Sequence, residues 1–185
     1  MYSYSISASN IISVTDGKNY NVVISLNPST GQPFTSSSDA ITYATNFVNN
    51  LNNYLLTNEK NQQISIINSA FNQTLNQGFT SPTLNFIVST DSTNLQNLHM
   101  LYTYMSVGNV ASAQIKTSNG VVTITLSQLT TLITELGEYL QSLYQQLWSI
   151  ESQINSATSM SQIKSINWTM PVSTLSTSAS ASGNA

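Results

Sequence analysis

The strongest constraint in this 185-residue sequence is a heptad repeat that runs through residues 127–157. Apolar side chains recur at alternating spacings of four and three, which is typical of a helix that packs along one continuous seam. They are Leu129, Ile133, Leu136, Leu140, Leu143, Leu147, Ile150, Ile154 and Ala157. At 1.5 Å per residue such a helix would be roughly 46 Å long. Ser127 is its expected N-cap, because a serine hydroxyl accepts a hydrogen bond from a first-turn N–H group.

The seam allows two interpretations: the helix packs only within its own domain, or it joins copies of the chain. Leu132, Tyr139 and Tyr144 widen the apolar stripe. The hairpin that precedes the helix offers too few apolar side chains to cover a stripe of this length. We therefore predict a homo-oligomer, with an interface formed by Leu129, Ile133, Leu136, Leu140, Leu143, Leu147, Ile150 and Ile154. Leu and Ile at these positions permit dimers, whereas the wide stripe favours a trimer or higher oligomer.

The N-terminal region alternates between apolar and polar residues and then changes to a helical period. The expected elements are strands over residues 2–8, 11–14 and 20–26, and an amphipathic helix over residues 39–57. Asp16-Gly17 marks a turn between the second and third strands. Residues 61–77 are ambiguous: Ile64 and Ile66 suit a short strand, whereas a helix is favoured by Ile64, Ile67, Phe71 and Leu75.

The C-terminal region reads as strand, helix, hairpin and long helix. A strand is expected over residues 84–89, followed by a helix that Asp91 can cap and that Gly108 ends as a left-handed residue. Asn119-Gly120 favours a two-residue type I′ hairpin that pairs Ile115 with Ile124. Ser159 can cap a last short helix. The fold class is therefore α+β, a small antiparallel sheet with amphipathic helices, and the expected parts are residues 1–80, residues 84–170 and a Ser-rich tail at 171–185.

The composition narrows the class of protein. Only 6% of residues are charged, against about 25% in ordinary soluble proteins, and Ser, Thr, Asn and Gln make up about half of the chain. There is no arginine and the formal net charge is −3, so a nucleic-acid partner is not expected. The sequence predicts neither a signal peptide nor a membrane-inserted helix. Solubility must come from neutral hydrogen-bonding groups, which suits exposure to an uncontrolled medium after release by cell lysis, as for a virus particle.

Candidate chemical groups are few. His99 is the only histidine, and Asp91 lies eight residues before it, but no nucleophile pattern accompanies them and a structural histidine is the better interpretation. Glu135 and Glu138 are one helical turn apart and are expected on a solvated face. The sequence therefore predicts no enzyme, no cofactor and no metal. Tyr2, Tyr4 and Tyr20 could form a sugar-binding face, although such tyrosines usually lie half-buried in a sheet.

Several stretches resemble tailed-bacteriophage proteins of the tail-fibre-associated and fibre-assembly (chaperone-like) family. These stretches are PSTGQPFTSSSDAITYATNFV at residues 28–48, FIVSTDSTNLQNLHMLYTYM at 86–105, SNGVVTITLSQLTTLITELGEYLQSLY at 118–144 and INSATSMSQIKSINW at 154–168. The similar C-terminal domain covers about residues 84–170. The near-absence of basic residues and the Ser-rich tail depart from that family.

The resemblance implies a non-enzymatic virion or assembly protein, oligomeric, that is associated with a phage tail fibre or caps it. Its expected partners are other copies of the chain and a phage tail fibre protein. Its expected location is the virion, after synthesis in the host cytoplasm. The alternative is a receptor-binding or capsid or tail decoration protein that contacts host surface glycans. Neither implies catalytic residues.

Overall fold

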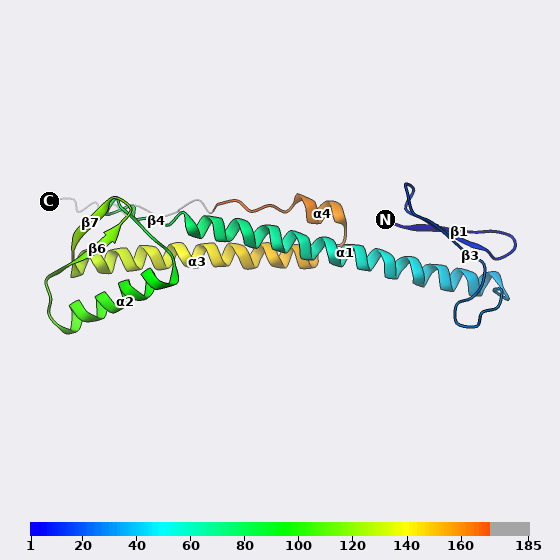
Figure 1. The fold of residues 1–185 in the computed structure, drawn as a ribbon, viewed down its shortest axis with the longest axis horizontal. Coiled ribbons are helices and arrows are strands. Elements are labelled where there is room, and N and C mark those ends of the chain that lie inside the picture. Colours follow the sequence, from blue (N-terminus) through cyan, green and yellow to red (C-terminus); the bar gives the residue numbers. More distant parts are fainter. Residues whose placement is uncertain (171–185) are drawn as a thin grey trace, which may run out of the picture. The chain divides into compact units, whose positions relative to one another are not determined.

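The structure, a computed structural model, describes residues 1–170 and confirms an α+β fold with small antiparallel sheets and a long C-terminal helix that follows a strand pair (Figure 1). The predicted tail at 171–185 lies outside the described residues. The chain divides into two units. The first unit is Met1–Gln62 with Ala157–Ile163, and the second is Gln63–Ser156 with the residues from Lys164 onward.

The first unit packs a three-stranded antiparallel sheet on the beginning of a helix. Strands β1 (Ser3–Ile6), β2 (Ile12–Thr15) and β3 (Asn21–Ile24) pair in this order, so the three predicted strands are confirmed. The turn at Asp16 is stabilised by its own carboxylate, which accepts hydrogen bonds from the backbone N–H groups of Lys18 and Tyr20. The buried core consists of Ile12, Val14, Phe34, Ala40, Ala44 and Val48.

Helix α1 (Ser37–Asn76) is much longer than the predicted helix at 39–57. Ser36 is its N-cap, since its hydroxyl accepts from the backbone N–H of Asp39 at 3.1 Å. The helix continues through the ambiguous stretch 61–77, and the division between the units falls inside it, at Gln62 and Gln63, rather than near the break expected at 80–84. The ambiguity is resolved because Ile67, Phe71 and Thr74 are buried at spacings of four and three, as a helical period requires.

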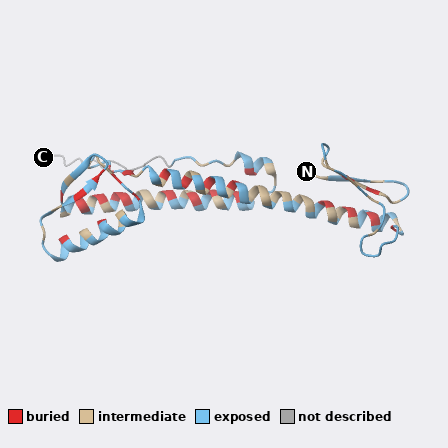
Figure 2. Ribbon diagram, viewed as in Figure 1, coloured by how far each residue is buried: buried red, intermediate tan, exposed pale blue. Residues whose placement is uncertain are grey.

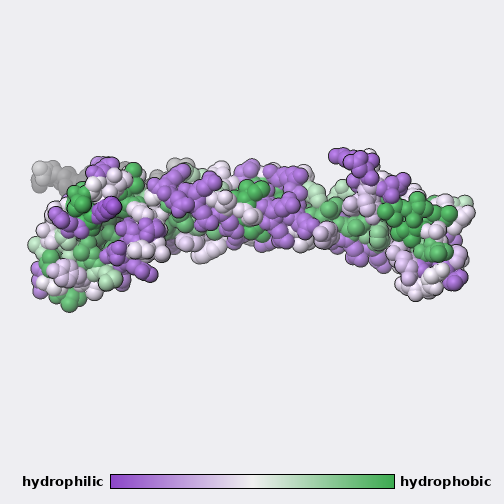
Figure 3. All heavy atoms as spheres, viewed as in Figure 1, coloured by the Kyte–Doolittle hydropathy of each residue, from purple (hydrophilic) through white to green (hydrophobic). Residues whose placement is uncertain are grey.

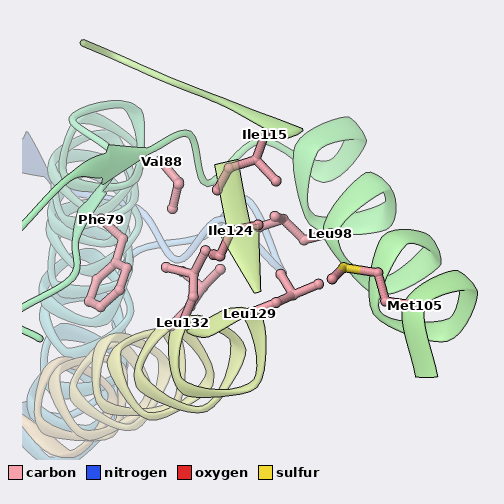
Figure 4. Close-up of a cluster of buried hydrophobic side chains, with 9 residues drawn as sticks. Phe79, Val88, Leu98, Met105, Ile115, Ile124, Leu129 and Leu132 are labelled. Atoms are coloured by element: carbon pink, nitrogen blue, oxygen red, sulfur yellow. The ribbon is translucent and has the colours of Figure 1, made fainter. Parts of the chain in front are cut away.

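The second unit begins with the end of α1 and contains the remaining strands. They are β4 (Phe79–Thr80), β5 (Ile87–Val88), β6 (Ser112–Thr117) and β7 (Gly120–Thr125), with helices α2 (Ser92–Val107) and α3 (Leu126–Ser156); α4 (Met160–Ser165) follows. One core joins these elements. Figure 4 shows side chains from β4, β5, α2, the β6–β7 hairpin and the start of α3 converging on it. The hairpin therefore packs on α3 and α2 together.

The β6–β7 hairpin forms at the predicted residues, but its two strands pair in a different register. Thr117 pairs with Gly120, so Ser118 and Asn119 are the central turn residues, and the predicted type I′ turn at Asn119-Gly120 is wrong. Ile115 pairs with Val122 rather than Ile124. The turn is supported instead by the Thr117 hydroxyl, which accepts from the Asn119 backbone N–H and donates to the Gly120 carbonyl. The apolar face is unchanged, because pairing partners moved by two residues keep their side of the sheet.

Three helix ends were also predicted, with mixed success. The N-cap of α3 is Thr125, not Ser127: the Thr125 hydroxyl accepts from the Gln128 N–H, and the Gln128 side chain accepts from the Thr125 N–H. Asp91 caps α2 as expected. Gly108 is not left-handed, with φ −82°, and Asn109 takes that conformation instead, with φ 51°. Gly108 is still required for space, since a Cβ there would lie 2.7 Å from the Tyr104 carbonyl oxygen.

A second core of this unit lies between the end of α1 and α3, which run side by side in Figure 1. Buried residues on the facing sides of these helices appear red in Figure 2. They are Ile67, Phe71, Leu143, Leu147, Ile150 and Ile154. The segment after α4 lies along the same pair: Gln63 donates to the Ile166 carbonyl, and the Trp168 indole N–H donates to the Thr74 hydroxyl at 3.0 Å.

Candidate functional site

The predicted oligomer interface is mostly covered by the chain itself. Six of its eight residues are buried, and these are Leu129, Leu136, Leu143, Leu147, Ile150 and Ile154. The first two belong to the core with α2 and the hairpin, and the other four to the core with α1. The hairpin alone is indeed too small to cover the seam, and the second half of α1, a stretch that the sequence leaves ambiguous, supplies the rest of the cover. Self-association itself stays a prediction.

One flank of α3 remains accessible. Ile133 and Leu140 are only half-buried, and Tyr144 and Trp148 expose 41% and 61% of their surface. With Gly137 they follow spacings of four, three, four and four, which places all five on one face of the helix. We call Ile133, Gly137, Leu140, Tyr144 and Trp148 the α3 stripe.

The aromatic end of the α3 stripe is fixed by ring contacts. The centroids of Tyr144 and Trp148 are 5.9 Å apart, and Tyr144 also contacts the buried Phe71 of α1 at 5.2 Å. Contacts of this kind between rings are favourable beyond the area that they bury. The Tyr144 ring is therefore held by the core on one side and exposed on the other.

The other end of the α3 stripe lines an apolar hollow of about 230 Å³ between α2 and α3. Its walls are formed by Leu95, Leu98, His99, Ile133, Leu136, Gly137 and Leu140. Gly137 leaves the hollow open, since a Cβ built there meets no atom within 4 Å. A glycine in a helix interior costs roughly 0.5–1 kcal/mol relative to alanine, and no close neighbour of Gly137 requires it.

Glu135 departs from its prediction. It is buried rather than solvated, and its carboxylate accepts hydrogen bonds from the hydroxyls of Ser81, at 2.5 Å, and Thr83. The Ser81 hydroxyl in turn accepts from the Leu84 backbone N–H at 3.0 Å. The carboxylate therefore fixes the β4–β5 connection on α3. Glu138, one turn further, is exposed as expected.

Asp91, the N-cap of α2, and His99 lie about two helical turns apart and have different surroundings. His99 is exposed at the rim of the apolar hollow. The Asp91 carboxylate is engaged locally: the Ser89 hydroxyl and then the Asn94 backbone N–H, both donating to it, lower the pKa of Asp91 below its ordinary value. Because Asp91 already caps the helix, the pair does not form an oriented acid–base site.

The three N-terminal tyrosines do not form one open face. Tyr2 and Tyr20 meet edge to face at 4.8 Å and pack against the core of the first unit. Tyr4 is more exposed and shares a hydrogen bond of 2.9 Å between its hydroxyl and that of Thr45. The predicted use of these residues in sugar binding stays a prediction.

A polar groove in the second unit offers a different surface for neutral ligands. It has a volume of about 470 Å³ and is lined by Gln146, Ser149, Ile150, Gln153, Ser165, Ile166, Asn167 and Thr169. Amide and hydroxyl groups dominate this lining, and it contains no ionisable side chain.

Among residues 1–170, no group of three or more His, Asp or Glu side chains is arranged to hold a metal ion. None of the helices there combines the length and the apolar character that a membrane span requires.

The fold is α+β with two long helices, and its sequence matches one family. The profile of the family described as Domain of unknown function (DUF4376) matches residues 58–169, and the chain belongs to this family. The matched range contains the described residues of the second unit except Met170. No curated protein and no solved structure matches the chain.

Proposed function

We propose that this protein is a non-enzymatic assembly or virion protein that acts by binding other protein chains, namely copies of itself and a phage tail fibre protein. The α3 stripe carries the proposal. Large aromatic side chains are enriched where proteins bind one another, and here two of them stand exposed beside an apolar hollow.

The rest of the surface supports a role in binding. With 6% charged residues, the chain presents mainly neutral polar groups, and Figure 3 shows hydrophilic residues over much of the visible face, interrupted by apolar areas. A surface of this kind depends little on salt, because few charges are available for screening. This suits a protein that stays assembled in an uncontrolled medium. The sequence resemblance supplies the tail fibre as partner.

The proposal is tested by co-purification from phage-producing cells. The chain is tagged, virus particles and fibre-containing intermediates are separated on a density gradient, and both are analysed by mass spectrometry and imaging. We expect the chain together with the fibre protein in at least one of these fractions. Its absence from both fractions, while it is present as free protein, would contradict the proposal.

A matched pair of variants tests the site. Replacing Tyr144 and Trp148 together by Gln removes the exposed aromatic end of the α3 stripe. Replacing Val121, which exposes 65% of its surface on β7, by Gln removes exposed apolar surface elsewhere. We expect the first variant to be lost from the fibre fractions and the second to be retained. Retention of both would contradict a role of the stripe in association with the fibre, whether by direct contact or through self-association.

The alternative function, contact with host surface glycans, is favoured by the polar groove. Neutral sugars are bound through amide and hydroxyl groups, and this groove offers Gln146, Gln153 and Asn167 without a charged neighbour in its lining. A glycan array compares the natural chain with the Gln153→Ala variant. Binding that the variant loses would favour the glycan-binding function, and the absence of any bound glycan would count against it.

A further inference from the structure

We infer that the α3 stripe is self-complementary and joins two copies of the chain in an antiparallel, two-fold symmetric contact. The inference rests on the self-association proposed above and names its surface and symmetry. The residues of the stripe and of the adjoining hollow all belong to the second unit and lie on α3 or α2.

The stripe carries a projection and a hollow at matching positions. Tyr144 is an exposed ring, and Gly137, seven residues earlier, opens the apolar hollow. The two positions are about 10.5 Å apart along the helix. A two-fold axis midway between Leu140 and Gln141 exchanges them, so each Tyr144 faces the Gly137 of the other copy. The same axis places Trp148 opposite Ile133.

The hollow has room for the ring. Its volume is about 230 Å³, whereas an engineered apolar cavity of about 150 Å³ already binds benzene. The hollow is walled by leucine and isoleucine side chains from two helices, so an aromatic ring that enters it buries apolar surface on both sides. An isologous contact of this kind uses the same patch on both copies and closes after two.

Charge does not oppose the contact. Between its first residue and Trp148, α3 carries only two charged residues, Glu135 and Glu138. Glu135 is turned inward to Ser81 and Thr83. Glu138 follows Gly137 by one position, which is about 100° around the helix, so it lies off the stripe. No pair of like charges therefore faces across the axis on this helix.

The contact also explains why this helix contains a glycine. Any larger residue except proline at position 137 would improve helix propensity but fill the hollow that receives Tyr144. Gly137→Gln is therefore a sharp test, because it should not damage folding and yet places a long polar side chain in the contact. We expect light scattering to show the natural protein as a dimer, with twice the 20.1 kDa mass of one chain. The dissociation constant of the Gly137→Gln dimer should be at least about tenfold higher than that of the natural dimer.

A control distinguishes the α3 stripe from another apolar surface. Met100 and Tyr104 on α2 expose 67% and 61% of their surface, one turn apart. Replacing both by Gln should leave the dimer intact. The inference would be overturned if this variant dissociates while the Gly137→Gln variant remains a dimer. It would also be overturned if the natural protein is a monomer at high concentration, or if its mass is three times that of one chain.

The symmetry is tested by single cysteines, which is possible because the chain has none. Gln141 lies next to the proposed axis, and Thr134 lies seven residues earlier on the same face of the helix. In an antiparallel pair, the two copies of residue 134 are about 20 Å apart along the helix, beyond disulfide reach. We expect mild oxidation to link Gln141→Cys dimers and not Thr134→Cys dimers.

Equal linking of both cysteine variants would show a parallel contact and overturn the inference, as would no linking of either. These outcomes are separate from the fibre test. A chain that dimerises as described but never accompanies a fibre would contradict the proposed function alone. A chain that accompanies the fibre as a monomer would contradict the two-fold contact alone.

Discussion

The two halves of α1 build their cores from side chains of very different size. In the first unit the helix presents Ala40, Ala44 and Val48 to the sheet, all of them buried. In the second unit it presents Ile67 and Phe71 to α3. Small residues permit close approach of the strands, whereas large ones fill the space between two helices. One continuous helix can therefore serve two partners, and the size of its buried residues distinguishes the two kinds of packing.

The difference also determines how each half responds to substitution. Where the buried residue is large, truncation leaves a cavity, and where it is small, enlargement causes strain. In the second half Phe71 is buried inside the core, and an aromatic side chain buries roughly 150–250 Å². We therefore expect the second unit to depend on α1 more strongly for its stability than the first unit does.

Among the substitutions that introduce no charge, the largest effect is expected for Phe71→Ala. The Phe71 ring is 6% exposed and contacts Tyr144 and Trp168, so its loss should reduce the free energy of unfolding by about 3–5 kcal/mol. Urea unfolding followed by tryptophan fluorescence measures it, since Trp168 lies in this core. Ile66→Ala, at a 59% exposed position of the same helix, is the control and should change stability by less than about 0.5 kcal/mol. Similar losses in both would contradict the helix orientation.

Enlargement is the matching test in the first unit. Ala44 is fully buried against the sheet, so Ala44→Leu should destabilise the protein by about 1–3 kcal/mol through overpacking. Asn46→Leu introduces the same side chain at an exposed position and should have little effect. Thermal unfolding followed by circular dichroism compares the two. A stabilised Ala44→Leu variant would show that the sheet does not pack closely on this helix.

The two glutamates of α3 offer a comparison within the second unit. Glu135→Ala removes the acceptor of the Ser81 hydroxyl, which is fully buried, and should cost about 1–3 kcal/mol. Glu138→Ala, at an exposed position, should be nearly neutral. Chemical denaturation of both variants gives the difference. Equal stability of the two variants would show that the β4–β5 connection is not fixed by this carboxylate.

The smallest effect is expected at the hairpin turn. Gly120 has φ +118°, a conformation that disfavours a β-branched residue, while a Cβ there meets no atom within 4 Å. Gly120→Val should therefore cost about 1 kcal/mol through backbone strain rather than through a clash. The melting temperature measures this change. An unchanged value would mean that the turn adopts another conformation than the one described.

Features that depend on neighbouring residues were predicted well from the sequence. The seam of α3, the Asp91 cap and the three N-terminal strands each follow from a local pattern, and the structure contains all of them. The α3 cap was misplaced by two residues because Ser127 and Thr125 are both suitable hydroxyl donors and acceptors. The two candidates are distinguished by the Gln128 side chain, which accepts a hydrogen bond from the backbone N–H of Thr125.

Features that depend on distant residues were missed. The second half of α1 was ambiguous because its partner, α3, lies far along the chain, and the covering of the seam was missed with it. Glu135 reads as a surface residue because its partners, Ser81 and Thr83, are more than 50 positions away. The α3 stripe was visible in part: Ile133 and Leu140 belong to the heptad pattern, but Trp148 lies outside it. A glycine within a strong helix pattern, as at Gly137, was the available signal for this site.

The central proposal is that six of the eight seam residues of α3 are packed inside the chain, whereas the α3 stripe binds a partner. Leu143 and Tyr144 are adjacent in sequence but 0% and 41% exposed, so they separate these roles. The most direct measurement is thermal unfolding at several protein concentrations for Leu143→Lys and Tyr144→Lys. We expect Leu143→Lys to abolish cooperative unfolding of the second unit at every concentration, and Tyr144→Lys to give a folded monomer with a concentration-independent melting temperature. A folded, helical Leu143→Lys monomer would contradict the account.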